Sequence, residues 1–173
     1  MNELTTLRLR LVPATAELTR LEVEARDRFF DQLQVAYAPD WPSENLAAAL
    51  PIFLEALDRD PSLVGWMAWY WILEGPSACE LVGGGGFKGK PMDGIVEIGY
   101  ETRPAFQRRG FATEAVGRLT QWALTHRTVD AVVAEADAGN AASIGILRRT
   151  GFREIGPGSD PGLRRYRLDK RGR

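Results

Sequence analysis

The sequence predicts a single mixed α/β domain. Strand-like and helix-like patterns alternate from one end to the other, and no internal repeat, low-complexity tract or linker separates them. The 173 residues are enough to bury one sizeable core, and 45% of them are hydrophobic against 26% charged. We therefore expect one globular α/β unit over residues 1–173.

The N-terminal part is predicted to contain a strand followed by helices. Residues 7–13 alternate leucine with arginine and end in a proline, which is the pattern of a half-buried strand. Thr15 is a candidate N-cap for a helix that runs to about residue 30. A second helical pattern spans residues 43–60, and Pro51 inside it indicates two short helices rather than one.

The rest of the chain alternates strands with helices. Four glycines, Gly83–Gly86, lie inside one predicted strand, and no helical pattern follows them. A bulged or closely packed strand is therefore favoured there over a nucleotide-binding loop. The predicted strands are 64–73, 80–88, 94–102, 130–137, 152–155 and 163–168, and the predicted helices are 113–126 and 141–150.

Composition argues against several classes of protein. There are 22 basic and 23 acidic residues, so binding to nucleic acid by bulk positive charge is not expected. The single cysteine, Cys79, excludes an internal disulfide, and no His, Cys or carboxylate cluster has metal-ligand spacing. Residues 1–10 contain no apolar run, and no stretch approaches the roughly 18 apolar residues of a membrane span. We expect a cytoplasmic protein without a metal.

Residues 107–113, Gln-Arg-Arg-Gly-Phe-Ala-Thr, have the character of a phosphate-binding turn. An extended segment precedes them and a helical pattern follows. The first N–H groups of a helix lack partners within it, and the helix dipole adds partial positive charge there. Gly110 and Ala112 leave the backbone accessible, and the two arginines can offset the charge of a pyrophosphate. The alternative is an ordinary basic surface turn before a helix.

Three motifs appear in a characteristic order: Gln107-x-x-Gly110-x-Ala112, the preceding Ile98-Gly99-Tyr100, and Asn140-Ala-Ala-Ser143 followed by Gly151-Phe152-Arg153. In these motifs the chain resembles the GNAT acyltransferase superfamily, closely over residues 94–156 and loosely before them. The forms of the second and third motifs resemble the branch that includes ribosomal-protein N-terminal acetyltransferases. The resemblance implies a GNAT fold of the α/β (α+β) class, with a mixed, twisted central sheet, helices on both faces and a splayed strand pair that admits acyl-CoA.

The resemblance also implies where acetyl-CoA would bind. Asn140 would bond the pantetheine amides, although a helix N-cap is the alternative role for its side chain. Backbone N–H groups around Gly99 and Tyr100 would polarise the thioester carbonyl. The implied cofactor-binding residues are Gly99, Tyr100, Glu101, Thr102, Gln107, Arg108, Arg109, Gly110, Phe111, Ala112, Thr113 and Asn140.

Catalysis by direct attack of an amine on the thioester requires a base and an acid. Glu97 and Glu135 are the candidate bases, and for each the alternative is a solvated strand-end carboxylate. Many members of the superfamily have a tyrosine acid seven residues after the asparagine, where this chain has Leu147. Ser143 is the candidate substitute, with a first-turn serine that bonds the backbone as its alternative.

The predicted activity is acyl-CoA-dependent N-acyltransfer, with acetyl-CoA as donor and a primary amine as acceptor. The acceptor is a small molecule or a peptide N-terminus, with no nucleic acid or membrane partner, and a homodimer is left open. A non-catalytic acyl-CoA-binding or sensing domain is the alternative. His126 is predicted to lie near a helix C-terminus rather than to act in catalysis. Trp66, Trp69 and Trp71 are predicted to be core residues rather than a stacking platform. The resemblance implies that Trp41, in a proline-rich loop, borders the acceptor cleft.

Overall fold

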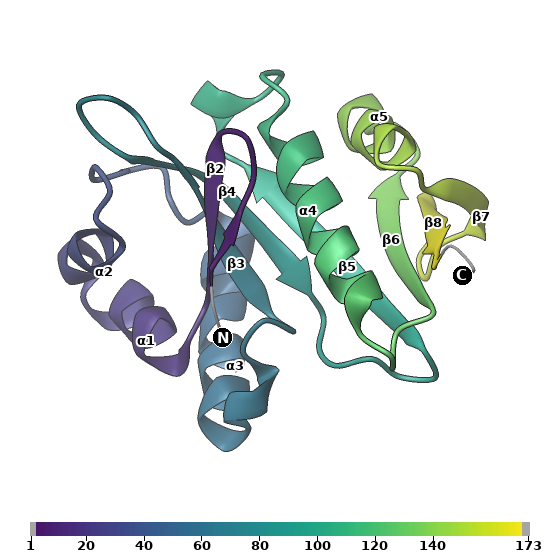
Figure 1. Cartoon of the computed structure of the whole chain (residues 1–173), viewed down its shortest axis with the longest axis horizontal. Helices are drawn as coiled ribbons and strands as arrows, with labels where there is room; N and C mark the ends of the chain where they lie inside the picture. Colours follow the sequence, from purple (N-terminus) through teal and green to yellow (C-terminus); the bar gives the residue numbers. More distant parts are fainter. Residues whose placement is uncertain (1–2, 171–173) are drawn as a thin grey trace.

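The computed structural model describes residues 3–170, and within them eight strands form one mixed sheet in the order β1-β2-β3-β4-β5-β6-β8-β7. The predicted domain of 1–173 extends over five terminal residues that lie outside the described residues. The strands are β1 Leu4–Thr5, β2 Leu9–Pro13, β3 Ala68–Leu73, β4 Glu80–Phe87, β5 Ile95–Thr102, β6 Ala131–Asp137, β7 Arg153–Pro157 and β8 Leu163–Asp169. The helices are α1 Ala16–Glu24, α2 Arg26–Leu33, α3 Glu44–Arg59, α4 Phe111–Thr125 and α5 Ala141–Arg149, with short 3₁₀ turns at Pro61–Leu63 and Pro104–Phe106 (Figure 1).

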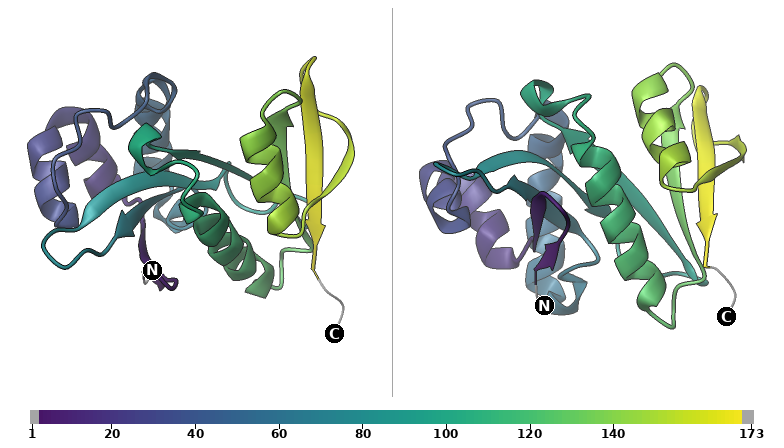
Figure 2. Two further views of the ribbon diagram at one scale, coloured as in Figure 1. Left: turned by 90° about the horizontal axis from the view of Figure 1, so that it is seen from above. Right: turned by 45° about the horizontal axis from the view of Figure 1, so that its top comes forward.

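The helices cover both faces of the sheet, as predicted. Figure 2 shows α4 on one side of the strands β2–β5 and α1–α3 on the other. Each side has its own apolar core. The larger core packs α4 and α5 against the sheet through residues such as Val96, Ile98 and Leu119, and the smaller one packs α1 and α2 through Phe29, Phe30 and related side chains.

The sheet opens between β5 and β6, and this confirms the predicted splayed pair. The two strands are parallel but pair over three residues, from Ile95 with Ala131 to Glu97 with Val133. Beyond Glu97, β5 continues beside β4, whereas β6 continues beside β8. The two halves of the sheet therefore diverge, and the second half of β5 faces the opening.

The four glycines of β4 are closely packed, which confirms the preferred interpretation of that segment. Val82 is an extra residue, because Trp71 pairs with Gly83 while Ile72 pairs with Leu81. A Cβ on Gly84 would lie 2.8 Å from the Trp41 ring, and one on Gly86 would overlap the Met67 carbonyl. Glycine is needed here because the neighbouring groups occupy the space that a side chain would take.

Several predicted boundaries in the N-terminal half need correction. Pro51 does not divide α3, which is one helix. Pro51 and Ala47, whose carbonyl loses its N–H partner, both lie on the exposed side of the helix, where an unpaired carbonyl costs little. The helix predicted after Thr15 is two helices, because Ala25 leaves helical geometry at φ −150°. Leu7 is 92% exposed, since the chain turns there between β1 and β2.

The predicted strand 64–73 is also too long. A 3₁₀ turn occupies Pro61–Leu63, and Gly65 adopts a left-handed φ of 88°. The chain therefore becomes extended at Ala68, where β3 begins. The other predicted strands and helices agree with the structure to within three residues at each end. Thr15 is the N-cap of α1, with its side chain accepting from the Leu18 N–H.

Candidate active site

The N-terminus of α4 is open toward the edge of the molecule. Gly110 is its N-cap, in left-handed geometry with φ 83°, and no side chain caps the helix. The first helical hydrogen bond is donated by the Glu114 N–H to the Gly110 carbonyl, so the N–H groups of residues 111–113 precede the helical ladder. Arg108 also has a positive φ, of 58°. This tight turn leaves backbone donors at the positive end of the helix dipole, which is a site suited to a phosphate group.

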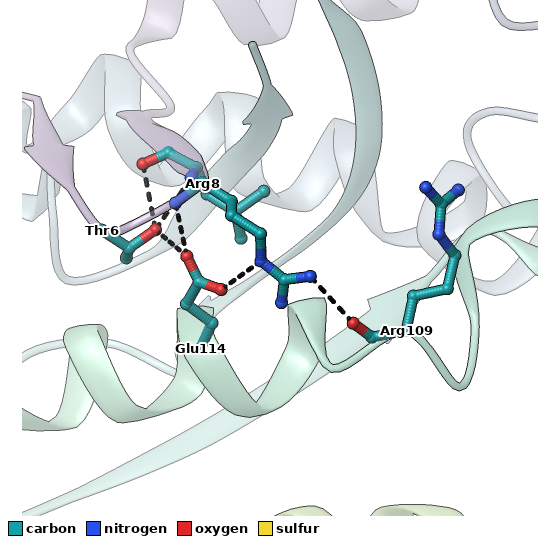
Figure 3. Close-up of polar contacts among 5 residues, drawn as sticks. Thr6, Arg8, Arg109 and Glu114 are labelled. Atoms are coloured by element: carbon teal, nitrogen blue, oxygen red, sulfur yellow. Dashed lines mark hydrogen bonds and ion pairs between the residues drawn. The ribbon is translucent and has the colours of Figure 1, made fainter. Parts of the chain in front are cut away.

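A brace from the N-terminal strands holds this turn (Figure 3). The Glu114 carboxylate accepts from the Thr6 hydroxyl, from the Arg8 backbone N–H at 2.7 Å and from Arg8 Nε at 2.8 Å. The Arg8 guanidinium then donates to the Arg109 carbonyl at 3.1 Å. Burial alone raises the pKa of the Glu114 carboxyl, but the bonds from Thr6 and Arg8 lower it below its usual value. The brace brings a half-exposed arginine beside Gly110, and the sequence analysis did not predict it.

On the α5 side of β5, the side chains of Tyr100 and Ser143 form a hydrogen bond. Their hydroxyl oxygens lie 2.9 Å apart across the opening between β5 and α5. Asn140 is the N-cap of α5, with its Oδ1 accepting from the Ser143 N–H at 3.0 Å. The alternative N-cap role of Asn140 is therefore present, and it uses only the amide oxygen. The alternative for Ser143 is not what the structure shows, because its hydroxyl bonds the tyrosine rather than the backbone.

A cavity of about 280 Å³ lies on the opposite face of β5, under α3. Two carboxyl groups, those of Glu22 and Glu101, lie in its lining. Glu22 is 2% exposed, and it accepts from Trp41 Nε1 at 2.8 Å and from the Tyr70 hydroxyl at 2.6 Å. Burial raises the pKa of Glu22 to about 7, and these two bonds only partly offset that effect.

The two candidate bases have different surroundings. Glu97 is the last residue of β5 that pairs with β6, and it forms an ion pair with Lys88. Glu135, on β6, accepts from the Ser159 hydroxyl at 2.7 Å, from the Ser159 N–H at 3.0 Å and from Arg165 at 3.1 Å. The Ser159 bonds and the nearby Arg165 charge lower the pKa of Glu135. Its carboxylate is thus already bound on several sides, whereas within residues 3–170 the Glu97 carboxylate pairs with Lys88.

A family model described as an acetyltransferase (GNAT) domain matches residues 8–153. The chain belongs to the GNAT acetyltransferase family. An uncharacterized N-acetyltransferase of Bacillus subtilis (strain 168), YjdG, is 34% identical over 114 residues, which cover 65% of this chain and 67% of that protein. The chain is therefore an acetyltransferase, and the recognised motifs belong to that family.

Solved GNAT structures share this fold. RimL, a ribosomal L7/L12 alpha-N-protein acetyltransferase in complex with coenzyme A, superposes with a TM-score of 0.65 at 18% identity, over 97% of this chain and 98% of that one. Mycobacterium smegmatis RimJ in complex with CoA-disulfide gives 0.66 at 20% identity, over 97% and 87%.

Several residues that the sequence analysis weighed as candidates for catalysis or binding have structural roles instead. Leu147, at the position of the usual tyrosine acid, is fully buried in the larger core. His126 is the C-cap of α4, and its ring contacts Trp66 and Trp122 with centroid distances of 4.8 and 4.5 Å. Trp69 and Trp71 are buried, as predicted. Among residues 3–170, no three His, Cys, Asp or Glu side chains gather into a potential metal site.

Glu22 was missed by the sequence analysis, although the sequence carries a signal for it. Leu18, Leu21 and Glu22 have the i, i+3, i+4 spacing of one helix face, so a carboxylate falls on the apolar side of α1. Glu101 was predicted to contact the cofactor, but its side chain lies on the α3 face and accepts from the Ser43 hydroxyl at 2.6 Å.

None of the helices in the described part of the chain is long and apolar enough to cross a membrane.

Proposed function

We propose that this GNAT acetyltransferase transfers the acetyl group of acetyl-CoA to a primary amine by direct attack in a ternary complex. The observation that carries the proposal is the opening of the sheet beside Gly99. The α4 turn and Ser143 lie toward one face of β5, and the cavity with Glu101 lies on the other. A Cβ on Gly99 would find no atom within 4 Å, so reactants from the two faces have room to meet there.

Acetyl-CoA would be held by backbone groups on the α4 and α5 side. The N–H groups of residues 111–113 would bind its pyrophosphate, with Arg8, Arg108 and Arg109 offsetting the charge. The pantetheine arm would run along the unpaired half of β5, residues 98–102, with the Asn140 amide as a further donor. This binding mode uses the donors that the opening of the sheet leaves available.

The amine must lose a proton before it attacks, and Glu97 is the proposed base. Its side chain lies on the same face as Gly99 and Glu101, because residues two apart on a strand share a face. The free amine then forms a C–N bond with the acetyl carbon, and the C–S bond breaks to release the CoA thiolate. The nitrogen loses its second proton in this step, and that proton replaces the one that the thiolate takes from Ser143. Glu135 is the less suited base, because its lowered pKa and several hydrogen bonds favour a carboxylate that holds no proton.

Two groups on the other face would assist the thioester. The Glu97 carbonyl accepts from the Lys88 backbone N–H, so the backbone groups of Glu97 point toward β4. Successive residues of a strand point their backbone groups to alternate sides, so the Tyr100 N–H points toward the opening. There it can polarise the thioester carbonyl. Ser143 would protonate the thiolate, with the Tyr100 hydroxyl as its hydrogen-bond partner. Burial raises the pKa of Tyr100, so the phenol stays protonated near neutral pH.

Release of free CoA with a panel of amines tests the activity, and three variants test the roles. Glu97→Gln should lose on the order of 100-fold in turnover near neutral pH and regain part of it at high pH, where the amine deprotonates unaided. Ser143→Ala should be slow at every pH, because the thiolate still needs a proton. Glu135→Gln is the matched comparison and should be affected less than Glu97→Gln.

Wild-type rates in all three variants across the pH range would show that the proposed roles are wrong. Binding of CoA without turnover of any amine would instead indicate an acyl-CoA-binding domain without catalysis.

A further inference from the structure

The cavity under α3 is mainly apolar. Leu46, Leu50 and Phe53 of α3 line one side, and Trp41 and Ala68 are apolar lining residues from the loop before α3 and from β3. Its volume of about 280 Å³ is slightly below the range of about 300–1,000 Å³ that is common for ligand pockets, so it suits a small ligand. Such walls gain free energy by covering a compact apolar group, and they offer few partners to a strongly hydrated one.

Glycines make the floor of this cavity. Gly84, Gly85 and Gly86 line it with backbone alone, and Trp41 packs against the first of them. Gly99 lines the end that faces the opening in the sheet. The cavity therefore leads directly to the place where the two strands separate, and the atoms nearest the proposed reaction centre leave room for a substrate.

The charged groups in the lining are two carboxyls and one ammonium, that of Lys88. Glu22 and Glu101 lie at one end, and the nearby Lys88 is paired with Glu97. Glu101 is the more accessible of the two carboxyls, because Glu22 is closed in by Trp41 and Tyr70. A cation that enters would also favour the charged form of Glu22, whose proton is otherwise retained by burial.

The spacing along β5 places a carboxylate on each side of Gly99. Glu97 and Glu101 are each two residues away on the same face, which is about 7 Å along the strand. An amine over Gly99 therefore lies between a residue that can accept its proton and one that can hold its charge before that step.

From this arrangement we propose that the acceptor is a small primary amine on a compact apolar frame, with its ammonium group held by Glu101 and its frame covered by the α3 wall. The inference rests on the proposed function and names its acceptor class. A phosphate- or carboxylate-bearing acceptor would meet the Glu101 carboxylate, and like charges at such distances repel. A polyamine would place further ammonium groups against Leu50 and Phe53, at a cost in desolvation.

The first experiment compares acceptors by CoA release. 2-Phenylethylamine and isoamylamine represent the proposed class, spermidine represents polycations, and taurine represents amines that carry an anion. We expect kcat/KM to be at least tenfold higher for the two apolar amines. An equal or higher value for spermidine or taurine would overturn the proposal.

Variants separate recognition from chemistry. Glu101→Gln should raise KM for 2-phenylethylamine on the order of tenfold with a smaller change in kcat, whereas Glu80→Gln, an exposed carboxyl on β4 outside the cavity, should change neither. Gly99→Val narrows the cavity at a position without neighbours within 4 Å, so it should weaken amine binding in a folded protein. An unchanged KM in both Glu101→Gln and Gly99→Val would contradict the assigned pocket.

Calorimetry separates failure of the pocket from failure of the activity. 2-Phenylethylamine is titrated into the protein saturated with CoA, which requires no turnover. Binding that weakens in Glu101→Gln but not in Glu80→Gln would support the pocket even if no amine released CoA. No binding to the wild-type protein, or equal binding to both variants, would overturn the acceptor assignment whatever the activity.

Discussion

Replacing Glu22 with glutamine should remove a pH dependence from the stability of the protein. Burial between Trp41 and Tyr70 raises the pKa of this carboxyl from 4.5 to about 7, so the folded state binds its proton more tightly than the unfolded state does. The resulting stabilisation is fully present below pH 4.5 and is lost as the pH rises through 7. Glutamine keeps the shape and a hydrogen-bonding amide but has no proton to lose.

The size of the effect follows from the shift in pKa. A rise from 4.5 to about 7 corresponds to about 3 kcal/mol, because each pKa unit is worth about 1.36 kcal/mol. Most of this lies between pH 5 and pH 8, so the free energy of unfolding of the wild-type protein should fall by about 2–3 kcal/mol more than that of Glu22→Gln over this interval.

Urea denaturation of both proteins at pH 5 and pH 8 measures this difference. Changes in unfolding free energy with pH that arise from other groups are common to the wild type and Glu22→Gln, so they cancel when the two proteins are compared. Glu80→Gln serves as the control, since this carboxyl is exposed, and it should follow the wild type. A wild-type and a Glu22→Gln protein that lose the same free energy between pH 5 and pH 8 would refute the reasoning.

Three further substitutions test the turn, the brace and the glycine floor. Gly110→Val places a branched side chain at a positive φ where the pyrophosphate would meet the backbone, so CoA affinity measured by calorimetry should fall on the order of tenfold or more; unchanged affinity in a folded variant would contradict the binding site. Glu114→Gln weakens the charged bonds to the β1–β2 turn and should cost about 1 kcal/mol of unfolding free energy in urea. Gly84→Ala should cost about 1–3 kcal/mol because the added carbon would displace Trp41. Gly99→Ala meets no neighbour and should stay near the wild type in stability; equal losses for both alanine variants would contradict the packing argument.

Local patterns in the sequence predicted most of the fold. Alternation, caps and glycine positions depend on near neighbours, so the strands from 80 onward and the α4 turn could be predicted from them. Pro51 shows where this fails, because whether a helix tolerates proline depends on which side faces water. The family motifs predicted the opening of the sheet at Gly99, which the strand register confirms.

Contacts between distant segments could not be predicted in this way. The brace joins Arg8 to Glu114 across 106 positions, and neither residue has an unusual local context. The α3 cavity is assembled from α1, the loop at Trp41 and three strands, so its acidic end at Glu22 and Glu101 depends on packing. The one local indication, a glutamate on the apolar face of α1, is only interpretable once that face has a partner.

The backbone of the sheet is divided beyond the short pairing between β5 and β6. Three residue pairs join the two strands, and beyond them the halves are bridged by side chains, through the larger core and the bond between Tyr100 and Ser143. The backbone groups of β5 that face the opening therefore have no partner on β6. An acyl-CoA arm bound in the gap would supply that partner. The amide of Tyr100 should therefore exchange its hydrogen quickly in the free protein and slowly with CoA bound, so that exchange at this amide reports whether the gap is filled.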